Sequence, residues 1–161
     1  VDVLARAAEY LPSYEIFLVG GTIEDVTRLR DKYNFPNLHI MGWVRHSAIP
    51  LWLRAADILV LPNSAKEKIG AEYTSPLKFF EYMASGVPIV ASRVPALVEI
   101  ALESEVTFFE PDNATSLAQA IESVINNYSN SQEKATKLFK KASQFTWDNR
   151  AGLILKHLTN V

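Results

Sequence analysis

Cysteine is absent from the 161 residues, and the sequence also lacks a long apolar run. Without thiols the chain has no cysteine nucleophile, disulfide or cysteine-based zinc or iron–sulfur site, which is typical of a reducing compartment such as the cytosol. No apolar run approaches the ~20 residues that a membrane span needs, and the first residues show no signal-peptide pattern. We therefore expect a soluble, cytoplasmic protein.

An excess of charge of one sign is also missing. Sixteen lysine and arginine residues stand against eighteen aspartate and glutamate residues, which gives a net charge of −2. A general nucleic-acid binder carries a basic surface, so no nucleic-acid partner is expected. An anionic ligand would have to be bound by a local site. The 48% of hydrophobic residues and the length predict one globular domain over 1–161.

Alternating helical and strand patterns predict the fold. Short apolar runs typical of buried strands lie at 15–19, 38–41, 57–61, 88–91 and 106–109. Helical patterns lie at 1–10, 23–34, 47–55, 75–85 and 96–102, and Thr22 is the expected N-cap of the second. Three more helices are expected after these, with N-caps at Asn113 or Asp112, at Ser131 and at Thr146. This alternation indicates an α/β class: a doubly wound, mostly parallel, Rossmann-like sheet with extra C-terminal helices.

Ligands of an open parallel sheet bind beyond the carboxyl ends of its strands, so the strand-to-helix turns are the candidate site. The richest turn comes before the fourth predicted helix. Ser75 is a good N-cap, and Pro76 suits the first helical position. The free N–H groups of Leu77 and Lys78, with the hydroxyls of Thr74 and Ser75, would suit a phosphate, and Lys78 adds a positive charge.

Glu81 is the second candidate in this helix. The 3.6-residue period places it away from the apolar face that carries Phe79 and Met83. One interpretation is a solvated carboxylate paired with Lys78, three residues earlier, and taken alone this is favoured. The other is a carboxylate that accepts the hydrogens of a ribose diol beside a phosphate site. The surrounding sequence has to decide between them.

The stretch from Thr74 to Ser92, TSPLKFFEYMASGVPIVAS, strongly resembles the signature of the glycogen-synthase-like (group 1) family of retaining glycosyltransferases. Further segments that resemble the family lie at 17–20, 40–44, 55–62 and 109–121. The resemblance implies the C-terminal, donor-binding half of the GT-B architecture, which pairs two Rossmann-like domains. The implied activity is transfer of a sugar from a nucleotide-sugar to a hydroxyl of a glycan, lipid carrier or small molecule, with no cofactor.

The resemblance also implies roles for individual residues. Glu81 corresponds to the second glutamate of the family's E-x7-E motif, which holds the ribose hydroxyls in relatives. Gly42 and Val44 occupy the loop whose backbone meets the nucleobase, and Gly20 lines the same crevice. Four residues fall where relatives bind the donor phosphates: Thr74, Ser75, Leu77 and Lys78. No catalytic residue is assigned, and no metal is expected, because the three histidines share no metal-ligand spacing.

Two features depart from the family pattern. The position of the first glutamate of E-x7-E is occupied by Tyr73, beside Glu72. The sugar-facing carboxylate is therefore either missing or supplied by Glu72. The family's first strand and the basic turn after it, whose side chains grip the diphosphate, would come before Val1. The implied partners are a nucleoside-diphosphate sugar and an N-terminal acceptor-binding domain of the same polypeptide. A lipid-linked acceptor would add peripheral contact with the inner face of a membrane.

Two alternatives stay open at this point. One is a non-catalytic Rossmann module that binds a nucleotide, and the other is a nucleotide-sugar epimerase of the same architecture. An acceptor-binding domain encoded upstream in the natural gene would favour the transferase, and its absence would favour the module. The nucleobase, the sugar and the acceptor are not determined by the sequence.

Overall fold

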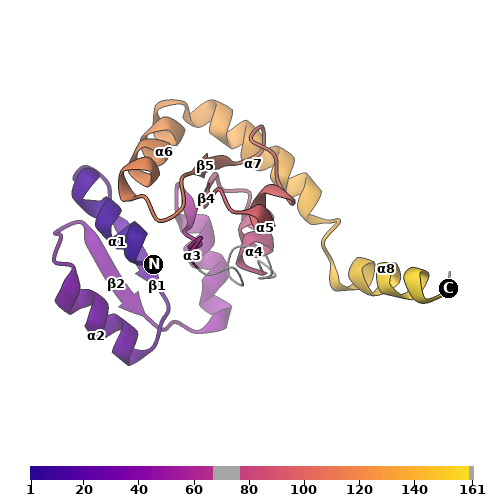
Figure 1. The fold of residues 1–161 in the computed structure, drawn as a ribbon, viewed down its shortest axis with the longest axis horizontal. Coiled ribbons are helices and arrows are strands. Elements are labelled where there is room, and N and C mark those ends of the chain that lie inside the picture. The colour runs from indigo at the N-terminus through magenta and orange to yellow at the C-terminus, as the bar shows by residue number, and fades with distance from the viewer. Residues whose placement is uncertain (67–76, 160–161) are drawn as a thin grey trace.

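The computed structural model describes residues 1–66 and 77–159. Its strands are β1 (Ile16–Val19), β2 (Leu38–Gly42), β3 (Leu59–Leu61), β4 (Ile89–Ser92) and β5 (Thr107–Phe109). Its helices are α1 (Asp2–Ala7), α2 (Ile23–Lys32), α3 (Ile49–Ala55), α4 (Leu77–Ser85), α5 (Pro95–Val98), α6 (Ala114–Asn126), α7 (Tyr128–Ala142) and α8 (Trp147–Thr159), with short 3-10 helices at Ala8–Tyr10 and His46–Ala48. Helices and parallel strands alternate as predicted, which confirms the α/β class (Figure 1).

The described strands form two parallel sheets, ordered β1-β2 and β3-β4-β5, where the sequence predicted one. Ile16 lies opposite Leu38 in the first sheet, and Val90 lies opposite Thr107 in the second. The orders β1-β2 and β3-β4-β5 both occur within the doubly wound order 3-2-1-4-5-6, as its strands 2-3 and 4-5-6. The division therefore corrects the expectation of one sheet, while the neighbours within each sheet are those of a doubly wound fold.

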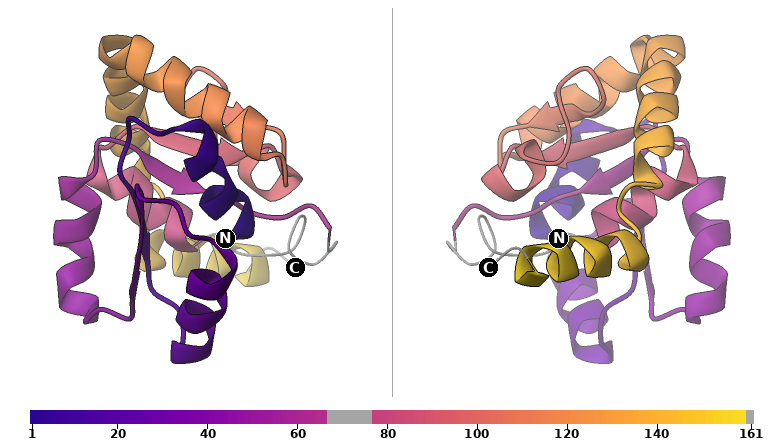
Figure 2. Two further views of the ribbon diagram at one scale, coloured as in Figure 1. Left: turned by 90° about the vertical axis from the view of Figure 1, so that its left-hand side faces the viewer. Right: turned by 90° about the vertical axis from the view of Figure 1, so that its right-hand side faces the viewer.

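Two hydrophobic clusters join helices to strands. The first contains side chains of α1, β1, β2 and α6 together with Val90 of β4, so it spans both sheets. The second contains side chains of β3, α4, α5 and α7 around Phe79, Met83 and Leu138. Helix α7 packs on α4, and α6 packs on α1 (Figure 2). Helix α4 is therefore held from two sides, by the second sheet and by α7.

Asp2 connects the first two helices. Its carboxylate accepts hydrogen bonds from Lys32 Nζ at 2.7 Å and from the Tyr33 hydroxyl at 3.0 Å. These bonds, that of Lys32 first, lower the pKa of Asp2 to about 2. The start of α1 is thus fixed to the end of α2 and remains so over the ordinary pH range.

Local capping was predicted well at three helices and wrongly at one. Thr22 and Asp25 form a capping box, Asn113 accepts from Ser116 N, and Thr146 accepts from Asn149 N. Ser131 does not cap a helix, because α7 begins three residues earlier, at Tyr128. The buried Ser131 hydroxyl instead donates to the carbonyls of Val124 and Asn127.

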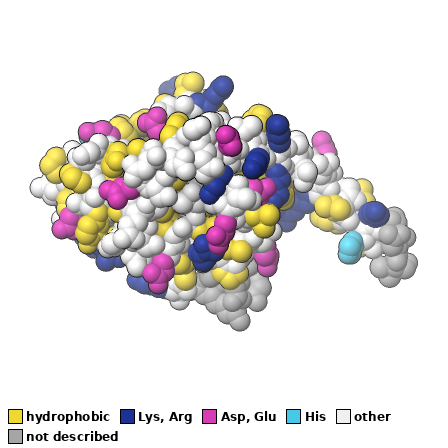
Figure 3. Space-filling model, turned by 90° about the horizontal axis from the view of Figure 1, so that it is seen from above, with side chains coloured by type: hydrophobic (Ala, Val, Ile, Leu, Met, Phe, Trp, Pro, Cys, Tyr) yellow, Lys and Arg dark blue, Asp and Glu magenta, His cyan; other side chains and the backbone are white. Residues whose placement is uncertain are grey.

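Helix α8 extends away from the rest of the molecule (Figure 1). Large apolar side chains on it are exposed: Trp147, Leu153, Ile154 and Leu158. In the space-filling view apolar side chains show along this projecting helix and also over the rest of that face, where positive and negative side chains are interspersed with them (Figure 3). Phe145, just before α8, stacks on Phe80 of α4 with ring centroids 4.8 Å apart. Apart from this connection, α8 adds little to the described core.

Candidate functional site

The carboxyl ends of β1 and β2 bring together two of the predicted site residues. Gly20, which follows β1, donates its N–H to the carbonyl of Gly42 at the end of β2, at 2.7 Å. The backbone φ angles are +111° at Gly20 and +72° at Gly42, a region that side chains disfavour. Val44 lies two residues beyond the end of β2 and is half-buried. Gly42 and Val44, predicted to meet the nucleobase, and Gly20, predicted to line the same crevice, thus share one edge of the first sheet.

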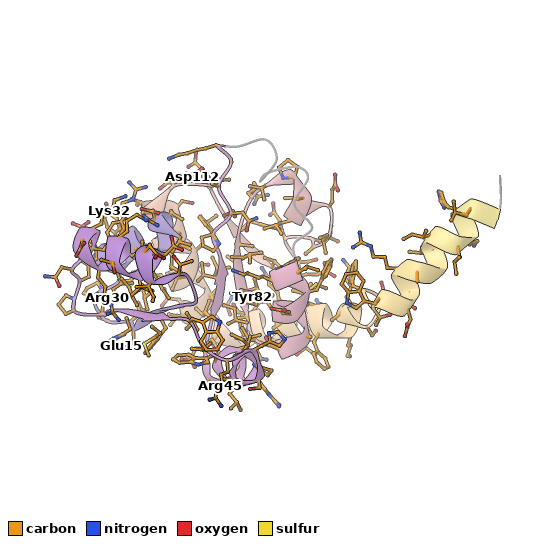
Figure 4. All side chains as sticks on the ribbon, turned by 90° about the horizontal axis from the view of Figure 1, so that it is seen from below. Glu15, Arg30, Lys32, Arg45, Tyr82 and Asp112 are labelled. Carbon is orange, nitrogen blue, oxygen red and sulfur yellow. The ribbon has the colours of Figure 1, made fainter. Side chains whose placement is uncertain are left out.

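A hollow of about 560 Å³ opens beside this edge. Its lining includes Gly42 and Trp43 from β2 and its turn, and Thr22 and Arg30 from α2. Arg30 Nη2 donates to the carbonyl of Ile40 at 2.6 Å, which holds the guanidinium against β2 (Figure 4). The Trp43 indole is 75% exposed, so it contributes a large apolar surface that no described element covers. The sequence analysis gave Arg30 no role in the site. The sequence shows it only as a basic residue in the last turn of a predicted helix.

A larger hollow, of about 640 Å³, runs along the outer surface of α2. It is lined by side chains of that helix alone, between Ile23 and Lys32, and touches none of the predicted site residues. It lies at no strand end and brings no second element to a ligand. The edge with Gly20 and Gly42 is therefore the better candidate.

Helix α4 presents its two faces as predicted. Phe79 and Met83 are buried, at 0% and 1% exposure, while Lys78 and Glu81 are exposed. Within residues 1–66 and 77–159 no ion pair joins Glu81 to Lys78, so the structure lends no support to the interpretation of a simple surface pair. Burial raises the pKa of Tyr82, and the adjacent Glu81 carboxylate raises it further.

Several predicted residues lie outside the described part of the chain. These are Thr74 and Ser75, assigned to the donor phosphates, and Glu72 and Tyr73, at the first glutamate position of the motif. Leu77 is the first described residue of α4 and is half-exposed. The roles of Thr74 and Ser75 therefore stay predictions.

The described residues contain no group of three histidine, aspartate or glutamate side chains placed to hold a metal ion. Over the same residues, none of the helices has the length and apolar character needed to cross a bilayer.

The sequence of the chain matches a known family. The model described as glycosyl transferases group 1 matches residues 1–127. The chain is 25% identical over 128 residues to a phosphatidyl-myo-inositol mannosyltransferase of Mycobacterium leprae (strain TN), an alignment that covers 79% of this chain and 33% of that protein. The chain thus spans about a third of the length of this relative.

Solved structures share the fold. The structure is similar to Anabaena HepE in complex with UDP-glucose, with a TM-score of 0.78 and 18% identity over 99% of this chain and 45% of that chain. It is also similar to the C-terminal domain of the group 1 glycosyl transferase LpcC from Francisella tularensis, with a TM-score of 0.67 and 19% identity over 89% of this chain and 75% of that one. The fold is that of one Rossmann-like domain of the GT-B glycosyltransferases. Since the family model also covers most of the sequence, the chain belongs to the group 1 glycosyl transferases.

Proposed function

We propose that this chain is the donor-binding domain of a retaining glycosyltransferase. It would take a nucleoside-diphosphate sugar and pass the sugar to a hydroxyl of a glycan, a lipid carrier or a small molecule. The observation that carries the proposal is the exposed pair Lys78 and Glu81 on a helix whose opposite face is fully buried. A protein of similar fold, Anabaena HepE, has been solved with UDP-glucose, which supports a nucleotide-sugar donor.

Lys78 is proposed to bind the donor diphosphate. It lies in the first turn of α4 as described, where free N–H groups and the helix dipole favour negative charge. Leu77 would contribute its backbone N–H, and Thr74 and Ser75 their hydroxyls. Charge that develops on the leaving diphosphate would be stabilised by these donors, held in place before the reaction begins.

Glu81 is proposed to accept hydrogen bonds from the ribose hydroxyls. It lies one turn beyond Lys78 on the exposed side of the same helix, a spacing that suits a ribose attached to a bound diphosphate. Gly42 and Val44 would meet the nucleobase through backbone groups, and Gly20 would line the same crevice. The nucleotide would then lie across the carboxyl edge from α4 toward the turn after β2.

The Glu81→Gln variant should bind nucleoside diphosphates more weakly by about 1–3 kcal/mol, because charge-assisted hydrogen bonds to a diol become neutral ones. Its melting temperature should stay nearly unchanged, because the side chain is exposed. Calorimetry with UDP, GDP and ADP measures the affinity. Glu133→Gln, an exposed carboxylate on α7, is the matched control and should bind as the parent does. Equal affinities of Glu81→Gln and the parent for all three nucleotides would return Glu81 to an ordinary surface role.

Removal of divalent cations should leave nucleotide affinity unchanged. The proposed site neutralises the diphosphate with Lys78 and helix N–H groups, and the residues that the structure describes offer no cluster of carboxylates, the preferred ligands of Mg²⁺. Titration of UDP, GDP and ADP with EDTA, and again with added Mg²⁺ or Mn²⁺, checks this. A requirement for either metal would refute the proposed neutralisation by the helix.

An acceptor-binding domain of the same polypeptide is the proposed partner. The relatives that the chain matches are two to three times its length. The exposed apolar side chains of α8, among them Trp147, Leu153 and Leu158, offer a surface for such a domain. The proposed location is the cytoplasm, at the inner face of the membrane if the acceptor is carried by a lipid.

A further inference from the structure

Trp43 differs from the other two tryptophans in having no described partner for its ring. Trp52 is half-buried, and its ring centroid lies 6.0 Å from that of Phe17. Trp147 has the Arg150 guanidinium over its ring, 5.7 Å from the centroid. Within residues 1–66 and 77–159, the exposed Trp43 indole meets neither an aromatic ring nor a cation. It lies just beyond the carboxyl end of β2, where a ligand of a parallel sheet is expected.

The hollow beside Trp43 has an apolar lining around this ring. Ile23, at the start of α2, and Met41 of β2 are both exposed, and both line the same hollow of about 560 Å³ as the indole. This volume is within the range of small-molecule sites, which combine an apolar lining with a few polar groups. The indole therefore offers a flat apolar surface to a planar ligand in a space of suitable size.

Arg30 supplies side-chain hydrogen-bond donors to this hollow. The two threonine hydroxyls of the described lining are used within α2, because that of Thr22 donates to Asp25 and that of Thr27 to a carbonyl one turn earlier. Arg30 uses one of its five N–H groups on the carbonyl of Ile40, at 2.6 Å. That bond fixes the guanidinium beside β2, and the exposed side chain keeps further N–H groups for a ligand (Figure 4).

The chemistry of the lining distinguishes between planar ligands. An indole stacks on any nucleobase, because every base has a π-face. A guanidinium has donors and no acceptor, so it binds carbonyl oxygens and is not paired by amino groups. Uracil and guanine present a carbonyl oxygen, whereas adenine presents an amino group at the position of the guanine oxygen. The lining therefore favours uracil or guanine over adenine.

We propose that Trp43 and Arg30 form the nucleobase subsite of the donor site. Trp43 stacks on one face of the base, and Arg30 donates to a carbonyl oxygen of the base. The subsite selects a uridine or guanosine diphosphate sugar over an adenosine diphosphate sugar. This inference rests on the proposed function, to which it adds the class of donor. The competing explanation is that a second domain covers the Trp43 ring, since exposed tryptophans are also frequent in protein interfaces.

Two-dimensional NMR of the 161-residue chain tests the stack. The three tryptophans give three indole N–H signals, and the signal missing from Trp43→Leu is that of Trp43. UDP and GDP should move this signal and leave that of Trp147 in place, whereas pyrophosphate, which has no base, should move neither. Trp43→Leu should bind UDP and GDP about 5- to 30-fold more weakly, the usual cost of losing one base stack.

Two aromatic replacements control this measurement. Trp43→Phe keeps a ring and should bind UDP and GDP within about threefold of the parent. Trp147→Phe changes a tryptophan of similar exposure on α8 and should bind as the parent does. Both side chains are exposed, so neither replacement should unfold the chain.

Arg30→Ala tests the selection between bases. The parent should bind UDP and GDP at least about fivefold more tightly than ADP, and Arg30→Ala should bind the three nucleotides alike. Arg54→Ala also removes an exposed arginine from the last turn of a helix, and it should keep the preference of the parent. Equal affinity of the parent for all three nucleotides would show that Arg30 does not select the base.

Three other results would overturn the subsite. If UDP and GDP shift the amide signals of Leu77 and Lys78 but not the Trp43 indole, the base lies elsewhere and the proposed function stands. If the indole signal moves only when an acceptor-binding domain is joined to the chain, the ring is a contact between domains. If the parent binds none of the three nucleotides, both this inference and the proposed function are wrong.

Discussion

A sugar-transfer assay should detect no product from the 161-residue chain alone, and should detect product when an acceptor-binding domain is joined to it in one polypeptide. Transfer requires an acceptor hydroxyl held against the anomeric carbon of the donor sugar. Correct placement of two reactants is worth effective concentrations of about 10⁵–10⁸ M. The proposed donor contacts all come from one side, from α4 and the turns after β1 and β2. The chain alone would bind a donor weakly, in the ~millimolar range, and could not orient an acceptor.

The assay would use a radiolabelled nucleotide-sugar and compare the chain with a longer polypeptide in which an acceptor-binding domain is joined to it. Glu81→Gln in the longer polypeptide provides the control, because its donor binding should weaken while the acceptor surface is unchanged. Transfer by the chain alone would show that the active site had been placed wrongly. A natural gene that encodes no second domain would favour the alternative of a nucleotide-binding module.

Replacement of Phe79 by alanine should lower the free energy of unfolding by about 3–5 kcal/mol, the usual cost of deleting a buried aromatic ring. Phe79 is fully buried in the second hydrophobic cluster, between β3, α4 and α7. The loss would remove its contacts and leave a cavity under the helix that carries Lys78 and Glu81. Because a small domain has a total stability of only ~5–15 kcal/mol, this loss would remove a large part of the free energy that keeps the chain folded.

Urea denaturation followed by circular dichroism measures this effect. Lys78→Ala, one position away on the exposed face, is the matched control for stability and should change it by less than about 0.5 kcal/mol. Lys78→Ala should nevertheless weaken nucleotide binding. Stability thus reports on the buried face of α4, and nucleotide affinity reports on its exposed face. A loss below about 1 kcal/mol in Phe79→Ala would mean that α4 is not anchored through this ring.

Features that depend on neighbouring residues were predictable from the sequence. The capping roles of Thr22, Asn113 and Thr146 follow from side chains that bind N–H groups two or three residues away. The exposure of Glu81 and the burial of Phe79 follow from the helical period. The motif around Glu81 indicated the family, which the family model confirms.

Features that depend on packing between distant segments were not predictable. Ser131 has the side chain of an N-cap, yet α7 starts three residues before it, and its hydroxyl donates to the carbonyls of Val124 and Asn127 instead. The division into two sheets was also missed, since the apolar runs of β1 and β3 carry no sign of which strands they pair with. The alternation of helical and strand patterns along the sequence predicts which segments form strands, but it does not predict which strands pair with each other.

The sequence by itself determined the class of fold, the helix that carries Lys78 and Glu81, and the family. The tertiary structure decided which turns meet at the carboxyl edge. Gly20 meets Gly42 because β1 pairs with β2, and Asp112 reaches Ser64, 48 positions away. Periods and caps act over a few residues and can be read along the chain, whereas these contacts exist only after strands far apart in sequence have paired.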